Sequence, residues 1–160
     1  MSGPQVSVVM GSSSDRADME GCLKILDELN VSYEVKVLSA HRMPEETLNY
    51  AKGLKQRGIK VVIAGAGGAA HLPGAIAANT TLPVIGVPLA LSPLKGVDAL
   101  CSIVQMPSGV PVACMAIGQA GAKNAAILAA QILALFSPKI DEKLREYKGR
   151  LSGDKPVGET

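Results

Sequence analysis

The chain has 160 residues, of which 48% are hydrophobic and only 2% aromatic, and its formal net charge is +2. A chain of this length is expected to form one domain with its own core, which we place at residues 1–151, followed by a mobile tail at residues 152–160. No block of like charges occurs and stacking side chains are scarce, so nucleic acid and membrane surfaces are excluded as expected partners.

The middle of the chain is almost free of charge. Between residues 61 and 137 only Lys95, Asp98 and Lys123 carry one. Prolines and glycines interrupt this stretch, so no apolar run reaches the roughly 20 residues that a membrane-spanning helix needs. We therefore interpret the stretch as a deeply buried centre. Because it is more apolar than one small monomer requires, we predict an oligomer.

The cysteines and the start of the chain indicate a reducing compartment. Cys22, Cys101 and Cys114 are odd in number and far apart, so they fit neither a zinc site nor a redox motif. We expect them to pack as small reduced hydrophobic residues. Residues 1–5 lead directly into a strand pattern, so no signal peptide is expected, and we predict a cytoplasmic location.

Apolar runs typical of strands alternate along the chain with segments of helical period. We predict strands at residues 6–10, 33–38, 61–64, 84–87 and 112–117. Helices are predicted at residues 15–29, 44–57, 73–79, 96–104 and 121–136, and a last amphipathic helix carries Ile140, Leu144, Tyr147 and Leu151. The strand at 33–38 alternates polar and apolar residues, which places it near an edge. The helix at 121–136 has almost no polar face, which predicts burial on all sides, in part by a neighbouring subunit.

Strands of continuous valine and isoleucine separated by helices predict a parallel sheet that is covered on both faces. The predicted fold is α/β: a flavodoxin-like, doubly wound, five-stranded parallel sheet in three α/β/α layers, with a C-terminal helix. Such sheets bind ligands beyond the carboxyl ends of their strands, at the switch point between the first and third strands. The loops after the first three strands are therefore expected to lie together.

The first of these loops has the sequence Gly-Ser-Ser-Ser-Asp at residues 11–15. Its glycine permits a tight turn, and its hydroxyls with the free N–H groups of the following helix suit an anion. Asp15 could accept hydrogen bonds from sugar hydroxyls. Alternatively, Ser14 or Asp15 serves only as the N-cap of that helix. The loop matches neither the Walker A pattern nor the GxGxxG pattern.

The only two histidines of the chain, His41 and His71, follow the second and third predicted strands. Histidine moves protons near neutral pH, and the neighbouring Arg42 offers a planar fork that matches phosphate oxygens. His71 lies in the glycine-rich segment 64–74, whose backbone could approach a ligand closely. The alternatives are a packed or surface His41 with a solvated Arg42, and a glycine segment that is only a tight connection in which His71 bonds to the backbone.

The remaining loop, at residues 105–111, is uncharged and could be a structural turn or the wall of a neighbour's pocket. No carboxylate pair, metal-ligand cluster or Ser–His–Asp set competes with the histidines. The residues therefore predict a site without metal, in which histidine acid/base chemistry acts on a phosphate-bearing small molecule. They do not name the reaction.

Five segments, in order, resemble the 5-(carboxyamino)imidazole ribonucleotide mutases of purine synthesis, within the class I aminoimidazole ribonucleotide carboxylase family. They are residues 11–15, 39–44, 64–74, 86–88 and 103–107. The similarity runs from about Val6 to Phe136. The chain departs from the family pattern at Met43, at residues 91–95 and in its tail.

The resemblance implies a reversible shift of a carboxylate from the exocyclic nitrogen of the imidazole to a ring carbon, through released CO2 and without ATP, metal or other cofactor. His41 would be the acid/base residue, and His71 would face the migrating carboxylate. A homo-octamer is also implied. The implied contacts to the 5′-phosphate, the ribose and the carboxylate are Ser12, Ser14, Asp15, Arg42, Ala66, Gly67, Gly68 and Leu72.

Two other functions remain open. Carboxylases of the same family use free CO2; that branch has a lysine after the equivalent histidine and lacks the Gly-Gly-Ala-Ala-His loop, so Arg42 and His71 favour the mutase. A non-catalytic sensor of nucleotide phosphates on the same scaffold would bind ligand without turnover. Such a sensor has little use for His41.

Overall fold

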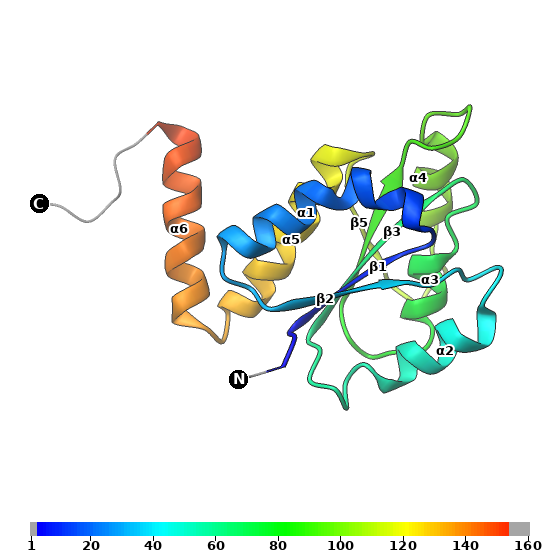
Figure 1. Cartoon of the computed structure of the whole chain (residues 1–160), viewed down its shortest axis with the longest axis horizontal. Helices are drawn as coiled ribbons and strands as arrows, with labels where there is room; N and C mark the ends of the chain where they lie inside the picture. Colours follow the sequence, from blue (N-terminus) through cyan, green and yellow to red (C-terminus); the bar gives the residue numbers. More distant parts are fainter. Residues whose placement is uncertain (1–2, 154–160) are drawn as a thin grey trace, which may run out of the picture.

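The computed structural model describes residues 3–153, and Figure 1 shows their arrangement around one five-stranded sheet. The strands are β1 (Val6–Met10), β2 (Tyr33–Val37), β3 (Val61–Gly67), β4 (Val84–Leu89) and β5 (Ala113–Cys114). All pairs are parallel, in the order β2-β1-β3-β4-β5. This order confirms the predicted flavodoxin-like fold and the edge position of β2.

The helices cover both faces of the sheet. They are the short 3₁₀ helix η1 (Ser13–Asp15), α1 (Arg16–Glu28), α2 (Pro44–Gly53), α3 (Leu72–Ala77), α4 (Val97–Val104), α5 (Gln119–Ala134) and α6 (Pro138–Ser152). Helices α1 and α5 lie on one face, and α2, α3 and α4 on the other (Figure 1). Helix α6 packs on the outside of α5, farthest from the sheet.

Strand β1 contributes to both halves of the core. Val6, Val8 and Met10 pack with α1 and α5, whereas Val9 packs with α2 and α3 on the opposite face. A strand buried on both faces has no solvent-facing positions, which explains why β1 is apolar except for the buried Ser7 and lacks a regular polar–apolar alternation.

Helix α5 is buried on one face by small residues. Ala122, Ala125, Ala126, Ala129 and Ala130 are all inaccessible to solvent, and α5 packs closely along α1. The opposite side carries exposed Lys123, Asn124 and Gln131. At the end of the helix Leu135 is 75% and Phe136 is 88% exposed. One chain therefore covers only part of α5, and its burial on all sides by a neighbour stays a prediction.

Several predicted boundaries differ from the structure. Strand β3 continues to Gly67, because residues 64–67 of the predicted glycine segment pair with β4. Helix α2 ends at Gly53 instead of residue 57, since the chain turns there towards Gly58, which has a left-handed φ of 89°. Strand β5 has two residues instead of six, although the Met115 N–H still donates to the Gly86 carbonyl.

At the C-terminal end, helix α6 includes Ser152, which the predicted boundary assigned to the tail, and Gly153 ends it with a φ of 71°. Residues 154–160, the rest of the predicted tail, lie outside the described residues.

All three cysteines are free. Cys22 is buried, which raises the pKa of its thiol to about 12, but Cys101 is exposed on α4 instead of packed as predicted. Among residues 3–153, no helix has both the length and the apolar character needed to cross a membrane.

Candidate active site

A cavity of about 410 Å³ opens at the edge of the sheet where the parallel strands end. The loops after β1, β2, β3 and β4 form its walls, so the predicted meeting of the first three loops is confirmed. The lining residues are Gly11, Ser12, Asp15, Ser39, Ala40, His41, Arg42, Ala66, Gly67, Gly68, Ala70, His71, Leu72, Leu91 and Ser92.

The wall after β1 is organised by a capping box at η1. The backbone N–H of Ser12 donates to Asp15 Oδ2 over 3.0 Å, and Ser12 Oγ accepts from the backbone N–H of Ser14 over 3.4 Å. Ser12 is therefore the N-cap of η1, whereas Asp15 occupies the N-cap position of α1 without a side-chain cap hydrogen bond there, so the alternative holds for the position of Asp15 but not for Ser14. Ser12 and Asp15 cap the turn and also line the cavity. Ser14 is exposed and lies behind Ser12, to whose Oγ its hydroxyl donates over 2.9 Å.

Asp15 is the buried acid of this wall, with only 5% of its surface exposed. Burial raises the pKa of its carboxyl above the usual 3.8, although hydrogen bonds from Ser12, Ser14 and Gly11 act in the opposite direction. Ionised Asp15 thus lacks part of the solvation that it would have in water. Ligand hydroxyls that donate to this carboxylate would replace that solvation.

Arg42 joins the wall after β2 to the wall after β1. Its Nε donates to Ser39 Oγ over 3.3 Å, and its Nη2 donates to the Gly11 carbonyl over 3.3 Å. Ser39 Oγ also accepts from the backbone N–H of Arg42 over 3.2 Å. These bonds leave other guanidinium N–H groups free, and they hold the cation beside Ser12 at the cavity wall.

The two histidines are in direct contact. His41 Nε2 lies 2.7 Å from His71 Nδ1, and the ring centroids are 4.7 Å apart in an edge-on arrangement with an interplanar angle of 68°. At this distance one ring nitrogen must donate and the other accept, so the pair shares a hydrogen atom. The His71 ring therefore bonds to His41, whereas the alternative placed it on the backbone. Both side chains are exposed to the cavity mouth.

The end of β3 and the start of α3 form the third wall. Ala66 and Gly67 are the last residues of β3, Gly68 follows with a left-handed φ of 60°, and Leu72 begins α3. A Cβ atom at Gly67 would lie 3.3 Å from the Cβ atom of Leu91. The absence of a side chain at Gly67 therefore allows the β4–α4 loop to close over this wall.

Leu91 and Ser92 are lining residues to which sequence reasoning assigned no role. They follow β4 at the same edge of the sheet, so applying the rule for carboxyl ends to the fourth strand would have found them. The loop at 105–111, in contrast, does not line the cavity of its own chain. Met106 from that loop packs towards Gly74 of α3 instead, with its sulfur 3.1 Å from where a Cβ atom would stand.

The chain is similar along most of its length to a known protein family. A model of the AIR carboxylase family matches residues 5–153. The chain belongs to the AIR carboxylase family. Within it, the chain is 60% identical to the N5-carboxyaminoimidazole ribonucleotide mutase of Bacillus subtilis, over 91% of this chain and 90% of that protein.

Other family members agree in sequence and fold. The N5-carboxyaminoimidazole ribonucleotide mutase of Haemophilus influenzae is 56% identical over 90% of this chain and 88% of its own length. The crystal structure of Treponema denticola PurE superimposes with a TM-score of 0.84 at 28% identity, covering 94% of this chain and 92% of that one. The sequence resemblance to this family is thereby confirmed.

The raised pKa of Asp15 predicts a pH-dependent effect of Asp15→Asn on stability. Protonated Asp15 favours the folded state, so its contribution is complete below pH 3.8 and is lost as the pH rises through the raised pKa. The free energy of unfolding of the parent, minus that of Asp15→Asn, should therefore fall between pH 3 and neutrality. Urea unfolding at matched ionic strength measures this difference.

The control for this prediction is Asp18→Asn, which removes a neighbouring carboxyl in α1 that does not line the cavity. The effect assigned to burial would be contradicted if the free energy of unfolding of the parent, minus that of Asp15→Asn, stayed constant or rose with pH.

Proposed function

We propose that this chain is an N5-carboxyaminoimidazole ribonucleotide mutase, an isomerase of purine biosynthesis. The observation that carries the proposal is the contact between His41 and His71 beside Arg42 in one cavity. Relatives that are 52–60% identical over 90–91% of this chain are named for that activity. Their names weigh against the alternative function, a carboxylase that uses free CO2.

The reaction requires one proton to be donated to the substrate and one to be removed from it. Cleavage of the N–CO2⁻ bond gives CO2 and a ribonucleotide with a free amine, and the amine nitrogen gains a proton in this step. The electron-rich ring carbon then attacks CO2, a C–C bond forms, and the ring carbon loses its own proton. One proton enters and one leaves, so a catalyst that can hold a proton meanwhile is sufficient.

The histidine pair suits that task. We assign His41 as the group that gives a proton to the departing nitrogen and later takes one from the ring carbon. His71, 2.7 Å away, would share the proton and hold the imidazole of His41 in one orientation and tautomer. At the end of a cycle the pair is back in its starting protonation state.

The first two walls suit the ribose phosphate. Arg42 and Ser12 would hold the 5′-phosphate, because the guanidinium has N–H groups beyond those bonded to Ser39 and Gly11 and the Ser12 hydroxyl lies at the same wall. Asp15 would accept hydrogen bonds from the ribose hydroxyls. A ligand held at both points is fixed in orientation against His41, which favours the reaction by proximity.

The third wall suits the migrating carboxylate. Ala66, Gly67, Gly68 and Leu72 present backbone and apolar groups without a side chain that could react with CO2. Leu91 closes this wall from the β4–α4 loop. We propose that CO2 is kept here between cleavage and recapture, while water is excluded.

A mass measurement tests the proposed oligomer. Large exposed apolar side chains remain on and near α4 and at the ends of α5 and α6, namely Leu91, Leu94, Val97, Val104, Leu135, Phe136 and Leu151. We propose that they are covered in a cytoplasmic homo-octamer. Light scattering should therefore give eight times 16.5 kDa, about 132 kDa. A mass of one chain would contradict the burial argument.

The function is tested by a turnover assay on N5-carboxyaminoimidazole ribonucleotide without metal or ATP, run with and without bicarbonate. We expect the ring-carboxylated isomer to form in bicarbonate-free buffer. Product formed only from aminoimidazole ribonucleotide plus bicarbonate would assign the chain to the carboxylases. Tight binding without turnover in either buffer would indicate the sensor.

Two substitutions should separate chemistry from binding. His41→Asn should abolish turnover but still bind the ribonucleotide, since it removes the proton carrier and keeps the arginine. Arg42→Ala should instead weaken binding by about 2–4 kcal/mol, the range for losing a charged contact at a desolvated site. Calorimetric titration measures ribonucleotide binding by both variants, and the turnover assay measures the activity of His41→Asn. Near-normal turnover in the first variant, or a parental isotherm in the second, would overturn the assigned roles.

A further inference from the structure

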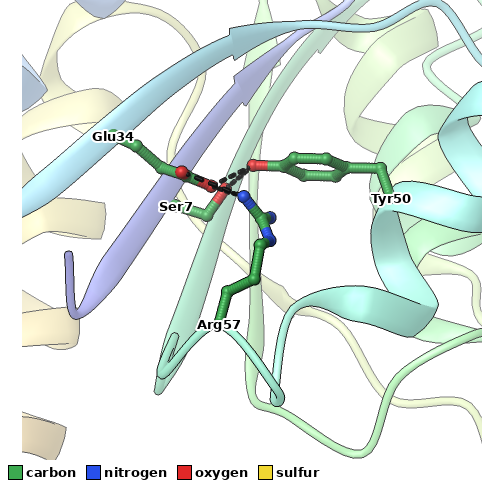
Figure 2. A network of polar contacts seen from close by, with 4 residues as sticks. All are labelled: Ser7, Glu34, Tyr50 and Arg57. Atoms are coloured by element: carbon green, nitrogen blue, oxygen red, sulfur yellow. Dashed lines mark hydrogen bonds and ion pairs between the residues drawn. The ribbon is translucent and has the colours of Figure 1, made fainter. Parts of the chain in front are cut away.

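Four polar side chains form a closed network at the amino-terminal half of β1 and β2, away from the cavity (Figure 2). Ser7, which has 0% exposure within β1, lies with its Oγ 2.7 Å from the Tyr50 hydroxyl. The Tyr50 hydroxyl donates to Glu34 Oε1, and Arg57 Nη1 donates to Glu34 Oε2 over 3.1 Å. The Arg57 guanidinium also stacks on the Tyr50 ring, 4.5 Å from its centroid.

The hydrogen atoms of this network can be assigned. A tyrosine hydroxyl has one hydrogen, which goes to the Glu34 carboxylate, so the hydroxyl of Ser7 donates to Tyr50 in turn. Burial and the Glu34 carboxylate both raise the pKa of Tyr50, so its hydroxyl stays protonated and continues to donate at neutral pH. Tyr50 is therefore the member that joins the other groups.

The network links four segments of the chain. Ser7 and Glu34 are register partners on β1 and β2, Tyr50 comes from α2, and Arg57 from the turn before β3. Figure 2 shows the Tyr50 side chain reaching from α2 to the strands, where Glu34 and Ser7 meet it. Tyr50 thus ties α2 to the edge of the sheet.

Helix α2 needs such a tie because few of its side chains are buried. Of its 10 residues only Thr47 and Ala51 are buried. An amphipathic helix is normally held by a broad apolar stripe, which α2 lacks. The hydrogen bonds of Tyr50 to Ser7 and Glu34 attach α2 to the sheet in a defined orientation, which its few buried apolar side chains do not provide alone.

The same helix begins directly after the loop at residues 38–43, which we call the His41 loop. This loop is bounded by β2, which carries Glu34, and by α2, which carries Tyr50. At its start the backbone N–H of Leu38 donates to the Met10 carbonyl of β1, and beyond that point its bonds to other segments at the site are the Arg42 bond to Gly11 and the His41 contact with His71. A shift of α2 relative to β2 would therefore move His41 and Arg42 relative to their partners.

We propose that Tyr50, through Glu34 and Ser7, is a positioning residue that sets the place of His41 and Arg42 at the active site. It touches neither the cavity nor the substrate. The proposal rests on the proposed function only in its kinetic consequence. The geometric consequence concerns the histidine pair and can be measured without turnover.

Tyr50→Phe is the test, and Tyr33→Phe is its matched control. Tyr33 lies on the same strand as Glu34 and its hydroxyl also donates to a carboxylate, Asp27 Oδ2, over 3.2 Å, but it does not contact α2. Because the chain has only two histidines, NMR signals of isotope-labelled histidine report on His41 and His71 alone. We expect displaced signals and a changed titration in Tyr50→Phe, and parental signals in Tyr33→Phe.

The kinetic readout follows the same pattern. Tyr50→Phe should raise KM by a factor of roughly 2 to 30, the range for mutations that act on a site through an intervening element, and should shift the pH profile of kcat/KM. If Tyr50 had a purely structural role, Tyr50→Phe would lower the midpoint of thermal unfolding. The KM and the pH profile of kcat/KM would then stay unchanged at temperatures below the unfolding transition. Tyr33→Phe should keep the parental KM and pH profile.

A double variant separates position from stability. Tyr50→Phe leaves the buried Ser7 hydroxyl without its partner, and adding Ser7→Ala removes that unpaired group, so stability should recover in part. The histidine signals should stay displaced, because α2 is still untied from Glu34. The proposal would be overturned if Tyr50→Phe kept the parental histidine signals. It would also be overturned if the double variant regained both its stability and the parental histidine signals. Displaced signals in a protein whose parent lacks turnover would support the positioning role while refuting the proposed function.

Discussion

The parallel, in-register pairing of β1 with its two neighbours is the constraint on which the site depends. Met10, the last residue of β1, is the register partner of both Val37 and Gly65. Since adjacent strands are about 4.8 Å apart, three chain segments leave the sheet side by side in one direction. The hydrogen bond from Arg42 to Gly11 and the contact between the histidines follow from this alignment. A slip in register would separate these groups even if every helix stayed intact.

The fold and the general location of the site could be predicted because their causes are local and periodic. Strands buried on both faces have continuous apolar runs, and parallel strands require helical crossovers, so the alternation of the two patterns predicted the sheet. The rule for carboxyl ends then placed His41, His71 and Asp15 at one edge. That rule extends to Leu91 and Ser92, which follow β4 at the same edge of the sheet and line the cavity.

Other features could not be read from the sequence because they depend on contacts between distant segments. The pattern of this loop allowed Ser14 or Asp15 as the N-cap, and only the backbone path makes Ser12 the cap of η1 and places Asp15 at the N-cap position of α1. The attachment of Tyr50 to Glu34 depends on how α2 crosses the edge of the sheet. Periodicity says which face of a helix is apolar, but not which polar side chain will meet a polar partner on a neighbouring strand.

The bonds of Arg42 to Ser39 and Gly11 determine whether the entropic cost of ordering its side chain belongs to folding or to ligand binding. A free arginine side chain samples many rotamers, and ordering it upon ligand capture opposes association. Here Ser39 and the Gly11 carbonyl already restrict the guanidinium. The loss of rotamer freedom is therefore part of the free energy of folding, and the phosphate that we propose as the ligand of Arg42 would meet a cation that is ordered in advance. Under that proposal, affinity for the phosphate would depend on the rigidity of the β1 loop as well as on the charge of Arg42.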